Sequence, residues 1–291
     1  MTAPPRRAPP PLTAARRGRW LAALCLLPFA LVFFAFQIAP LLWVAVNSVQ
    51  TAEGWSLDNF TRIIGSRFYR QAISHSLQVA FWSSLSGLLI ALLGSYSLHK
   101  VDSRLRDFVN AFATMTSNFA GVPLAFAFII LLGFNGALTL LLRQIGWIED
   151  FNLYSKSGLI VIYTYFQIPL GVLLLFPAFD AIREDWRESA ALLGAPTWRF
   201  WYHIGLPVLT PALIGTFVIL LANALGAYAT VYALTTGNFN IVPIRIAALV
   251  AGDISLDPWL ASALAMLLVG LMALITLVHQ WLLRRSYHAA R

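Results

Sequence analysis

The chain has 291 residues, of which 59% are hydrophobic and 11% charged, and its mean hydropathy is +0.74. Soluble globular domains carry about 25% charged residues, so this composition excludes an ordinary soluble protein and predicts an integral membrane protein. Cys25 is the one cysteine, which excludes an intramolecular disulfide and a metal cluster built on thiolates. The formal net charge of +8 has two possible sources, nucleic-acid binding or membrane topology.

Residues 1–19 are proline-rich and contain five arginines. They have too little apolar surface to offset the entropy of ordering, which predicts a disordered basic tail. The apolar run at residues 20–46 is longer than the core of a signal peptide, about 7 to 15 residues, and no A-x-A cleavage site closes it. We therefore predict that this run is retained as a membrane helix.

Six uncharged stretches are long enough to cross about 30 Å of hydrocarbon as helices. They are residues 20–46, 76–98, 108–133, 157–179, 208–236 and 259–283. The outer connections between them are too short for a separate folded domain. The prediction is an all-α integral membrane protein with one six-helix domain over residues 20–285, a tail at 286–291, and both termini on the same side of the membrane.

The lysines and arginines are divided unequally between the two sides. Fourteen of the 20 fall in the N-terminus, the loops near 99–107 and 180–207, and the C-terminus, whereas the acidic residues divide six and six. Basic loops mark the cytoplasmic side, so both termini are predicted to be cytoplasmic. The positive charge is thereby explained by topology, and no nucleic-acid partner is expected.

Several spans contain residues that break helices. Gly121 and Pro123 lie well inside the third span, and Pro169 and Pro177 interrupt the fourth; such breaks are tolerated where protein or water satisfies the freed backbone groups. The stretch 136–150 is expected to form a short helix, either in the membrane interface or packed in a loop. Ala222, Gly226 and Thr230 are spaced four residues apart, which predicts close helix packing along the fifth span.

No Asp, Glu, Lys or Arg lies inside any of the six spans. Proton-coupled and sodium-coupled carriers usually need intramembrane carboxylates or histidines, and voltage sensors need arginines. The sequence therefore gives no sign of an ion-coupled carrier or a voltage sensor.

The cytoplasmic segment 180–207 interrupts this apolar pattern. Asp180, Glu184 and Asp185 favour a helix start through the helix dipole, while Gly194 and Pro196 are typical of a helix end. We expect one face of this helix to pack against the protein's own spans, through Phe179, Ile182, Trp186, Ala190 and Leu193. The other face carries Glu188 and is suited to a groove on a partner, although a surface helix without a partner is equally compatible with the pattern.

The spacing in this segment resembles the Glu-Ala-Ala loop of permease subunits from binding-protein-dependent ABC importers, such as the maltose and methionine systems. Ser189 departs from the usual alanine, a small-for-small change, and the resemblance covers roughly residues 70–285. It implies the type I, MetI-like permease fold and a coupling helix that docks on an ATPase. The ATPase-coupling residues that it implies are Glu188, Ser189, Ala190, Gly194, Ile204, Leu206 and Pro207.

The same resemblance implies that the chain is not an enzyme. The sequence has no G-x-x-x-x-G-K-[ST] phosphate loop, so ATP and Mg would be used by a partner ATPase dimer, and the chain itself would bind no cofactor and no metal. The other implied partners are a second permease, homologous or identical, and an external solute-binding protein, at the bacterial inner membrane. A stand-alone carrier or channel remains the alternative of another class; an integral-membrane enzyme lacks a visible catalytic constellation.

Residues 152–182 and 221–253 look most like the spermidine/putrescine group of these permeases. A polyamine is therefore the expected cargo, with thiamine, ferric iron, an aminophosphonate or an oxyanion as alternatives. Tyrosine rings in the pathway could attract a polycation through cation–π contacts of about 0.5 to 2 kcal/mol each. The pathway candidates from the bent spans are Asn118, Phe119, Tyr165, Gln167, Asn223, Tyr228 and Tyr232.

Overall fold

The computed structural model describes residues 26–101, 103–148, 151–252 and 256–289. The predicted tail at 1–19, the first residues of the first span and Cys25 lie outside these ranges. Six helices within the described residues are long and apolar enough to cross a membrane, as predicted. They are Leu26–Ser48, Arg67–His99, Val122–Gln144, Lys156–Phe179, Thr197–Gly226 and Pro258–Trp281.

The first of these helices contains a π-helical stretch, η1 (Phe34–Ile38), followed by α2 (Ala39–Ser48). A short hairpin of β1 (Gln50–Thr51) and β2 (Gly54–Trp55) follows, with Gln50 opposite Trp55 and Thr51 opposite Gly54. Then come α3 (Asp58–Gly65) and the long α4 (Arg67–His99). Along Leu26–Ser48 only Ser48 is buried, so the first helix presents its apolar side chains outward.

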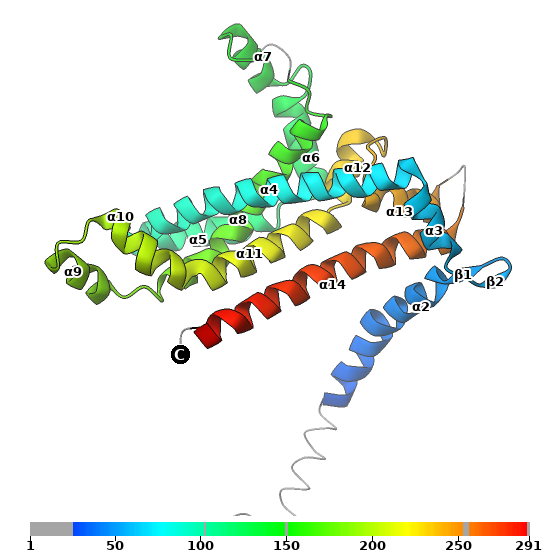
Figure 1. The fold of residues 1–291 in the computed structure, drawn as a ribbon. Coiled ribbons are helices and arrows are strands. Elements are labelled where there is room, and N and C mark those ends of the chain that lie inside the picture. The colour runs from blue at the N-terminus through cyan, green and yellow to red at the C-terminus, as the bar shows by residue number, and fades with distance from the viewer. Residues whose placement is uncertain (1–25, 102, 149–150, 253–255, 290–291) are drawn as a thin grey trace, which may run out of the picture.

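The two ends of the bundle carry different elements (Figure 1). One end carries α9 (Glu184–Leu192) and α10 (Thr197–Phe200), and the last helix, α14 (Pro258–Ala289), runs back toward it. The other end carries the hairpin, α3 and α13 (Val242–Ala251). Helix α14 continues to Ala289, so the segment expected to be a tail from residue 286 begins as helix.

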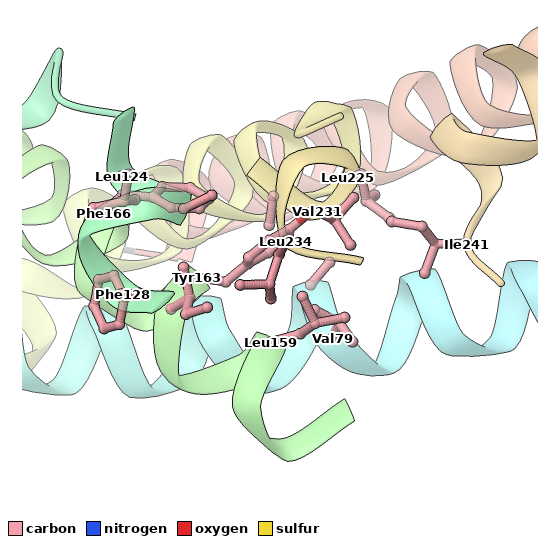
Figure 2. Packing of buried hydrophobic residues seen from close by; sticks show 14 of the residues in the cluster. Val79, Leu124, Phe128, Leu159, Tyr163, Phe166, Leu225, Val231, Leu234 and Ile241 are labelled. Atoms are coloured by element: carbon pink, nitrogen blue, oxygen red, sulfur yellow. The ribbon is translucent and has the colours of Figure 1, made fainter. Parts of the chain in front are cut away.

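The centre of the bundle is the contact between α4 and α8 (Lys156–Phe179). Two glycines allow the close approach: a Cβ on Gly87 would lie 2.7 Å from Cβ of Gln167, and one on Gly171 would lie 2.7 Å from Cβ of Ala91. Small residues at such crossings are the usual way for membrane helices to pack. Around this contact a buried cluster includes Tyr163 and Leu225 (Figure 2).

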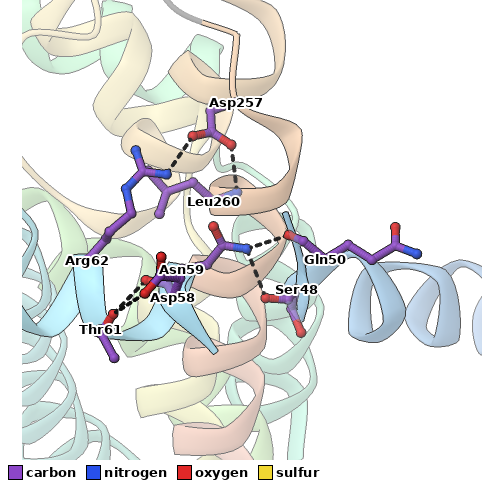
Figure 3. A network of polar contacts seen from close by, with 8 residues as sticks. All are labelled: Ser48, Gln50, Asp58, Asn59, Thr61, Arg62, Asp257 and Leu260. Atoms are coloured by element: carbon purple, nitrogen blue, oxygen red, sulfur yellow. Dashed lines mark hydrogen bonds and ion pairs between the residues drawn. The ribbon is translucent and has the colours of Figure 1, made fainter. Parts of the chain in front are cut away.

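At the opposite end from α9, a polar network ties the loops to α14 (Figure 3). Asn59 is 1% exposed, and its Nδ2 donates to the carbonyls of Ser48 at 3.2 Å and Gln50 at 2.8 Å. An ion pair joins Arg62 to Asp257 at 3.3 Å, and the other carboxylate oxygen of Asp257 accepts from the N–H of Leu260 at 3.0 Å. The hairpin and α3 are therefore anchored on the start of α14.

The third and fifth spans are both interrupted. The third consists of α5 (Ser103–Ser117) and α6 (Val122–Leu132), with a break at Gly121, which has φ +76°. The predicted bend at Gly121 and Pro123 is thus present. The expected limits 108–133 correspond to α5 and α6 together, whereas the apolar membrane-length segment is Val122–Gln144, which adds α7 (Ala137–Gln144) after a turn.

The fifth span starts earlier and ends earlier than expected. It runs through α10, η2 (Trp201–Gly205) and α11 (Leu206–Gly226), and α12 (Ala229–Thr235) is a separate helix. A single helix over 208–236 is therefore wrong. The predicted row of small residues is also wrong, because Thr230 lies on α12 whereas Ala222 and Gly226 lie on α11.

Candidate coupling loop and translocation cavity

Helix α9 is short, and the two carboxylates of its first turn pair with arginines of the same segment. Glu184 and Asp185 occupy its first turn, where carboxylates favour the helix dipole. Arg183 pairs with Asp185 at 2.6 Å, and Arg187 pairs with Glu184 at 2.8 Å. The helix begins at Glu184 and not near Asp180, because Asp180 is the C-cap of α8.

The end of α9 has the conformation expected from Gly194 and Pro196. Gly194 has φ +76°, its N–H donates to the carbonyl of Ala191, and the N–H of Ala195 donates to the carbonyl of Ala190, both at 2.9 Å. This pair of hydrogen bonds is the Schellman motif. A residue with a Cβ is disfavoured at such a φ by about 1 kcal/mol or more, so the turn is fixed by glycine.

Neither face of α9 is covered by the protein itself. No residue of the helix is buried, and Leu192 and Leu193 are 90% and 87% exposed. The expected packing of an apolar face onto the spans is wrong, because Phe179 belongs to α8 and is buried there while Leu193 projects away. Two adjacent leucines are therefore left in the open at the end of α9.

The predicted coupling residues fall into two groups, one on α9 and its terminal turn and the other beyond α10. Glu188 is exposed, the hydroxyl of Ser189 donates to the carbonyl of Asp185 at 2.7 Å, and Ala190 is half-buried. Ile204 belongs to the π-helical turn η2, and Pro207 lies in the first turn of α11 next to Leu206. The π-helical turn therefore lies within the fifth span, between α10 and α11.

The two helix breaks face each other across a cavity. Its volume is about 520 Å³, and its walls include Ser117, Gly121, Asn223, Tyr228 and Thr230. These residues come from the α5–α6 break and the α11–α12 break. None of the residues that line the cavity is charged.

Side chains from distant parts of the chain satisfy the backbone groups at these breaks. The N–H of Gly121 donates to Oγ1 of Thr230 at 3.0 Å, and the hydroxyl of Tyr163 donates to the carbonyl of Ala227 at 2.8 Å. Unsatisfied groups in a membrane cost several kcal/mol each. These two hydrogen bonds therefore satisfy a backbone group at each break. They also join the breaks to other helices of the bundle.

Gln167 does not reach the cavity. It is fully buried, and its Nε2 donates to the hydroxyl of Ser84 at 3.1 Å and to the carbonyl of Leu220 at 2.6 Å. Its Oε1 accepts from Nδ2 of Asn223 at 3.3 Å. Asn223 itself lines the cavity, and this hydrogen bond fixes its side chain against Gln167.

Of the other pathway candidates, only Tyr228 lines this cavity. Tyr232 lies tilted against Tyr228, with ring centroids 5.2 Å apart. Asn118 bonds back to the carbonyl of Thr114 at 2.9 Å, and Phe119 is 42% exposed in the α5–α6 connection. Tyr165 packs edge-on against Phe128 at 5.3 Å and does not line this cavity.

Two lining residues with hydroxyl groups, Ser117 and Thr230, were not among the candidates, and neither was Tyr163, which bonds to the backbone of the lining residue Ala227. Ser117 lies four residues before the predicted break at Gly121, so the sequence could have indicated that it borders the break. Thr230 was expected only in helix packing, and Tyr163 has no local signal at all. Across the described residues, no three His, Cys, Asp or Glu side chains converge on a possible metal position.

Comparisons with known proteins agree with this architecture. The ferric transport system permease protein FbpB of Actinobacillus pleuropneumoniae is 25% identical over 267 residues, and the match covers 90% of this chain but only 38% of FbpB. The sn-glycerol-3-phosphate transport system permease protein UgpA of Shigella flexneri is 24% identical over 283 residues, covering 90% of this chain and 93% of UgpA. The spermidine/putrescine subgroup is not confirmed by these relatives.

Solved structures share the fold. A chain of a bacterial ABC transporter involved in the import of the acidic polysaccharide alginate superposes with a TM-score of 0.75 at 20% identity, covering 94% of this chain and 98% of that one. The inward-facing MetNI methionine ABC transporter gives a TM-score of 0.56 at 18% identity, covering 74% of this chain and 94% of that one. The likeness shows the MetI-like permease fold.

The family comparison covers most of the spans described above. Residues 87–286 match the family described as "Binding-protein-dependent transport system inner membrane component". This range includes α9, the Gly194 turn and both helix breaks. The chain belongs to this family and is a multi-pass inner-membrane permease subunit of an ABC importer.

Proposed function

We propose that this chain forms one half of a solute pathway and couples it to a cytoplasmic ATPase dimer through α9 and the Gly194 turn. The observation that carries the proposal is the exposed end of α9, where a Schellman motif presents Leu192 and Leu193 away from the bundle. An apolar helix end of this kind suits a groove on a partner. The chain would bind no ATP or Mg itself, since these belong to the ATPase.

The second half of the pathway would come from another permease, identical or homologous. The cavity between the two helix breaks is lined by residues of one chain and carries no charge. Weak, uncharged contacts allow a solute to leave, and substrate choice would then reside in an external binding protein. Alternating access would follow from the ATPase binding the inward-facing and outward-facing states with different affinity.

A polyamine is no longer the favoured cargo. The relatives reported above are named for ferric iron and sn-glycerol-3-phosphate, and no carboxylate lines the cavity to attract a polycation. We propose a small solute delivered by the binding protein, with iron and phosphate-ester cargoes as the first to test. A thiamine, aminophosphonate or oxyanion cargo would use the same machinery.

The experiment is to purify the intact complex with a tag on this chain, identify its subunits, and measure which labelled solute its binding protein retains. Uptake of that solute into proteoliposomes should require ATP on the cytoplasmic side. Solute movement by the isolated chain along an ion gradient would instead support a stand-alone carrier and contradict the proposal.

A further inference from the structure

A groove of about 390 Å³ lies where the last turns of α4 meet the loop that follows α9. Its walls include Leu92, Leu93 and Tyr96 from α4, and Trp198, Trp201 and Leu209 from the coupling segment and α11. The volume is within the range of small-molecule sites, about 300 to 1,000 Å³. The lining is apolar and aromatic, and it belongs neither to the central cavity nor to α9.

The aromatic wall of this groove is held in place. Trp201 meets Tyr96 edge-on, with ring centroids 5.1 Å apart and an interplanar angle of 87°. Gly205 lies directly against the same indole, since a Cβ there would come within 2.4 Å of a ring carbon. The π-helical turn η2 therefore positions Trp201 as one side of the groove.

Two exposed cations lie on the aromatic rim. The Nζ of Lys100 is 4.1 Å from the centre of the Tyr96 ring, and the Cζ of Arg199 is 5.5 Å from the centre of the Trp198 ring. No ion pair joins either cation to a carboxylate within the described part of the chain.

The neighbouring cations differ in this respect. Arg183 and Arg187 are both paired with carboxylates at the start of α9. Asp180, which follows Phe179 in the groove wall, faces His99 at 3.7 Å. The Asp180 carboxylate is exposed, and its contact with His99 is an ion pair only when that imidazole is protonated, so the rim sets two cations, Lys100 and Arg199, against the Asp180 carboxylate.

We propose that this groove binds a phospholipid with an anionic headgroup. An acyl chain lies against the leucines and Trp201, and the headgroup phosphate lies near Lys100 and Arg199. Tryptophan and tyrosine rings gather at membrane interfaces, and each nearby Lys or Arg strengthens binding of anionic lipid by about fivefold. The proposal rests on the proposed function in one respect, the cytoplasmic orientation of this end of the bundle.

The groove is built from the ends of two spanning segments, Arg67–His99 and Thr197–Gly226. Its mouth is therefore expected at the level of lipid headgroups, whereas α9 projects farther out (Figure 1). This placement favours a lipid over a protein as the occupant.

The test uses the intact transporter complex in nanodiscs of phosphatidylcholine with about one fifth phosphatidylglycerol, followed by native mass spectrometry of retained lipids. We expect wild type to retain phosphatidylglycerol over phosphatidylcholine. The double variant Lys100→Gln, Arg199→Gln should lose this preference by about 10- to 30-fold. The matched control, the double variant Arg183→Gln, Arg187→Gln, removes the same amount of positive charge at α9 and should keep the preference for phosphatidylglycerol.

Three outcomes overturn the proposal: no preference in wild type, equal loss in both double variants, or retention that depends on the absence of the ATPase. The last would mean that the ATPase covers the groove. Co-purification of the ATPase and uptake are measured on the same samples. If the Lys100, Arg199 double variant loses the lipid preference but keeps its coupling to the ATPase, the lipid site is separate from the coupling function. Absence of coupling in the wild-type complex would contradict the proposed function and not the lipid site.

Discussion

At the residue scale, Gln167 and Asn223 have different tasks although both were expected to line the pathway. Gln167 is buried and bonds three partners on α4 and α11, whereas Asn223 borders the cavity. A buried carboxamide that joins three helices is a positioning residue. Asn223, its hydrogen-bond partner on α11, is the residue placed to contact a solute.

Replacement of Gln167 by leucine should lower the free energy of unfolding by about 1 to 3 kcal/mol, because Ser84 loses its partner and Asn223 loses the acceptor that orients it. Denaturant titration of the purified chain in detergent measures this. Gln78→Leu is the control, since Gln78 is bonded only to Ser74 and Lys156 at an exposed position. Equal destabilisation by both variants would contradict the assigned role.

Asn223→Ala and Tyr228→Ala should reduce solute uptake or its coupling to ATP while the complex still assembles, because both side chains border the cavity. Tyr165→Ala serves as the comparison, since Tyr165 packs against Phe128 away from that cavity. Initial uptake rates in proteoliposomes check this. Unchanged kinetics in both cavity variants would show that solute passes elsewhere.

At the element scale, the helix breaks are held by hydrogen bonds between distant segments. Removing the hydroxyl in Tyr163→Phe leaves the carbonyl of Ala227 without its donor, and Thr230→Val leaves the N–H of Gly121 without its acceptor. Each variant should lower the unfolding free energy by about 1 to 3 kcal/mol. Thr210→Val is the control, since Thr210 bonds only the carbonyl of Leu206 in its own helix. Thermal unfolding measures the effect. A loss of stability in Thr210→Val as large as in the other two variants would contradict the role given to these hydrogen bonds.

These elements also show what the sequence could and could not predict. The break at Gly121 and the end of α9 at Gly194 were predictable, because glycine and proline act on their own backbone. The break after Gly226 was not, because it is held by Tyr163 and Thr230, whose relation exists only after the chain has packed. The apolar residues around α9 were misassigned for a similar reason: their spacing does not tell a face that is buried from a face left open for a partner.

At the scale of the whole molecule, α9 and the hairpin occupy opposite ends of the bundle (Figure 1). From the charge distribution we predict that the end carrying α9 is cytoplasmic. Reporters fused after Arg291 and near Lys100 should both be cytoplasmic, and reporters near Trp55 and Gly252 should be external. Alkaline phosphatase and fluorescent-protein fusions distinguish the two sides. A cytoplasmic Gly252 would contradict the six-span topology.

The central claim is that the Gly194 turn transmits force from an ATPase and does not merely complete the fold. Gly146 provides a matched comparison: it has the same φ of +76° and, like Gly194, open space within 4 Å of the point that a Cβ would occupy, but it lies after α7. Gly194→Asp and Gly146→Asp should therefore carry the same backbone strain. Glu188→Lys is expected to act as Gly194→Asp does, to a smaller degree, and Arg183→Ala should have little effect.

The deciding measurement is ATPase co-purification and ATP-driven uptake, made side by side for Gly194→Asp and Gly146→Asp at equal membrane levels of the chain. We expect Gly194→Asp to lose most of its bound ATPase and its uptake, and Gly146→Asp to keep both. Normal uptake with Gly194→Asp would contradict the coupling role, and loss of that variant from the membrane would show that the glycine serves folding instead.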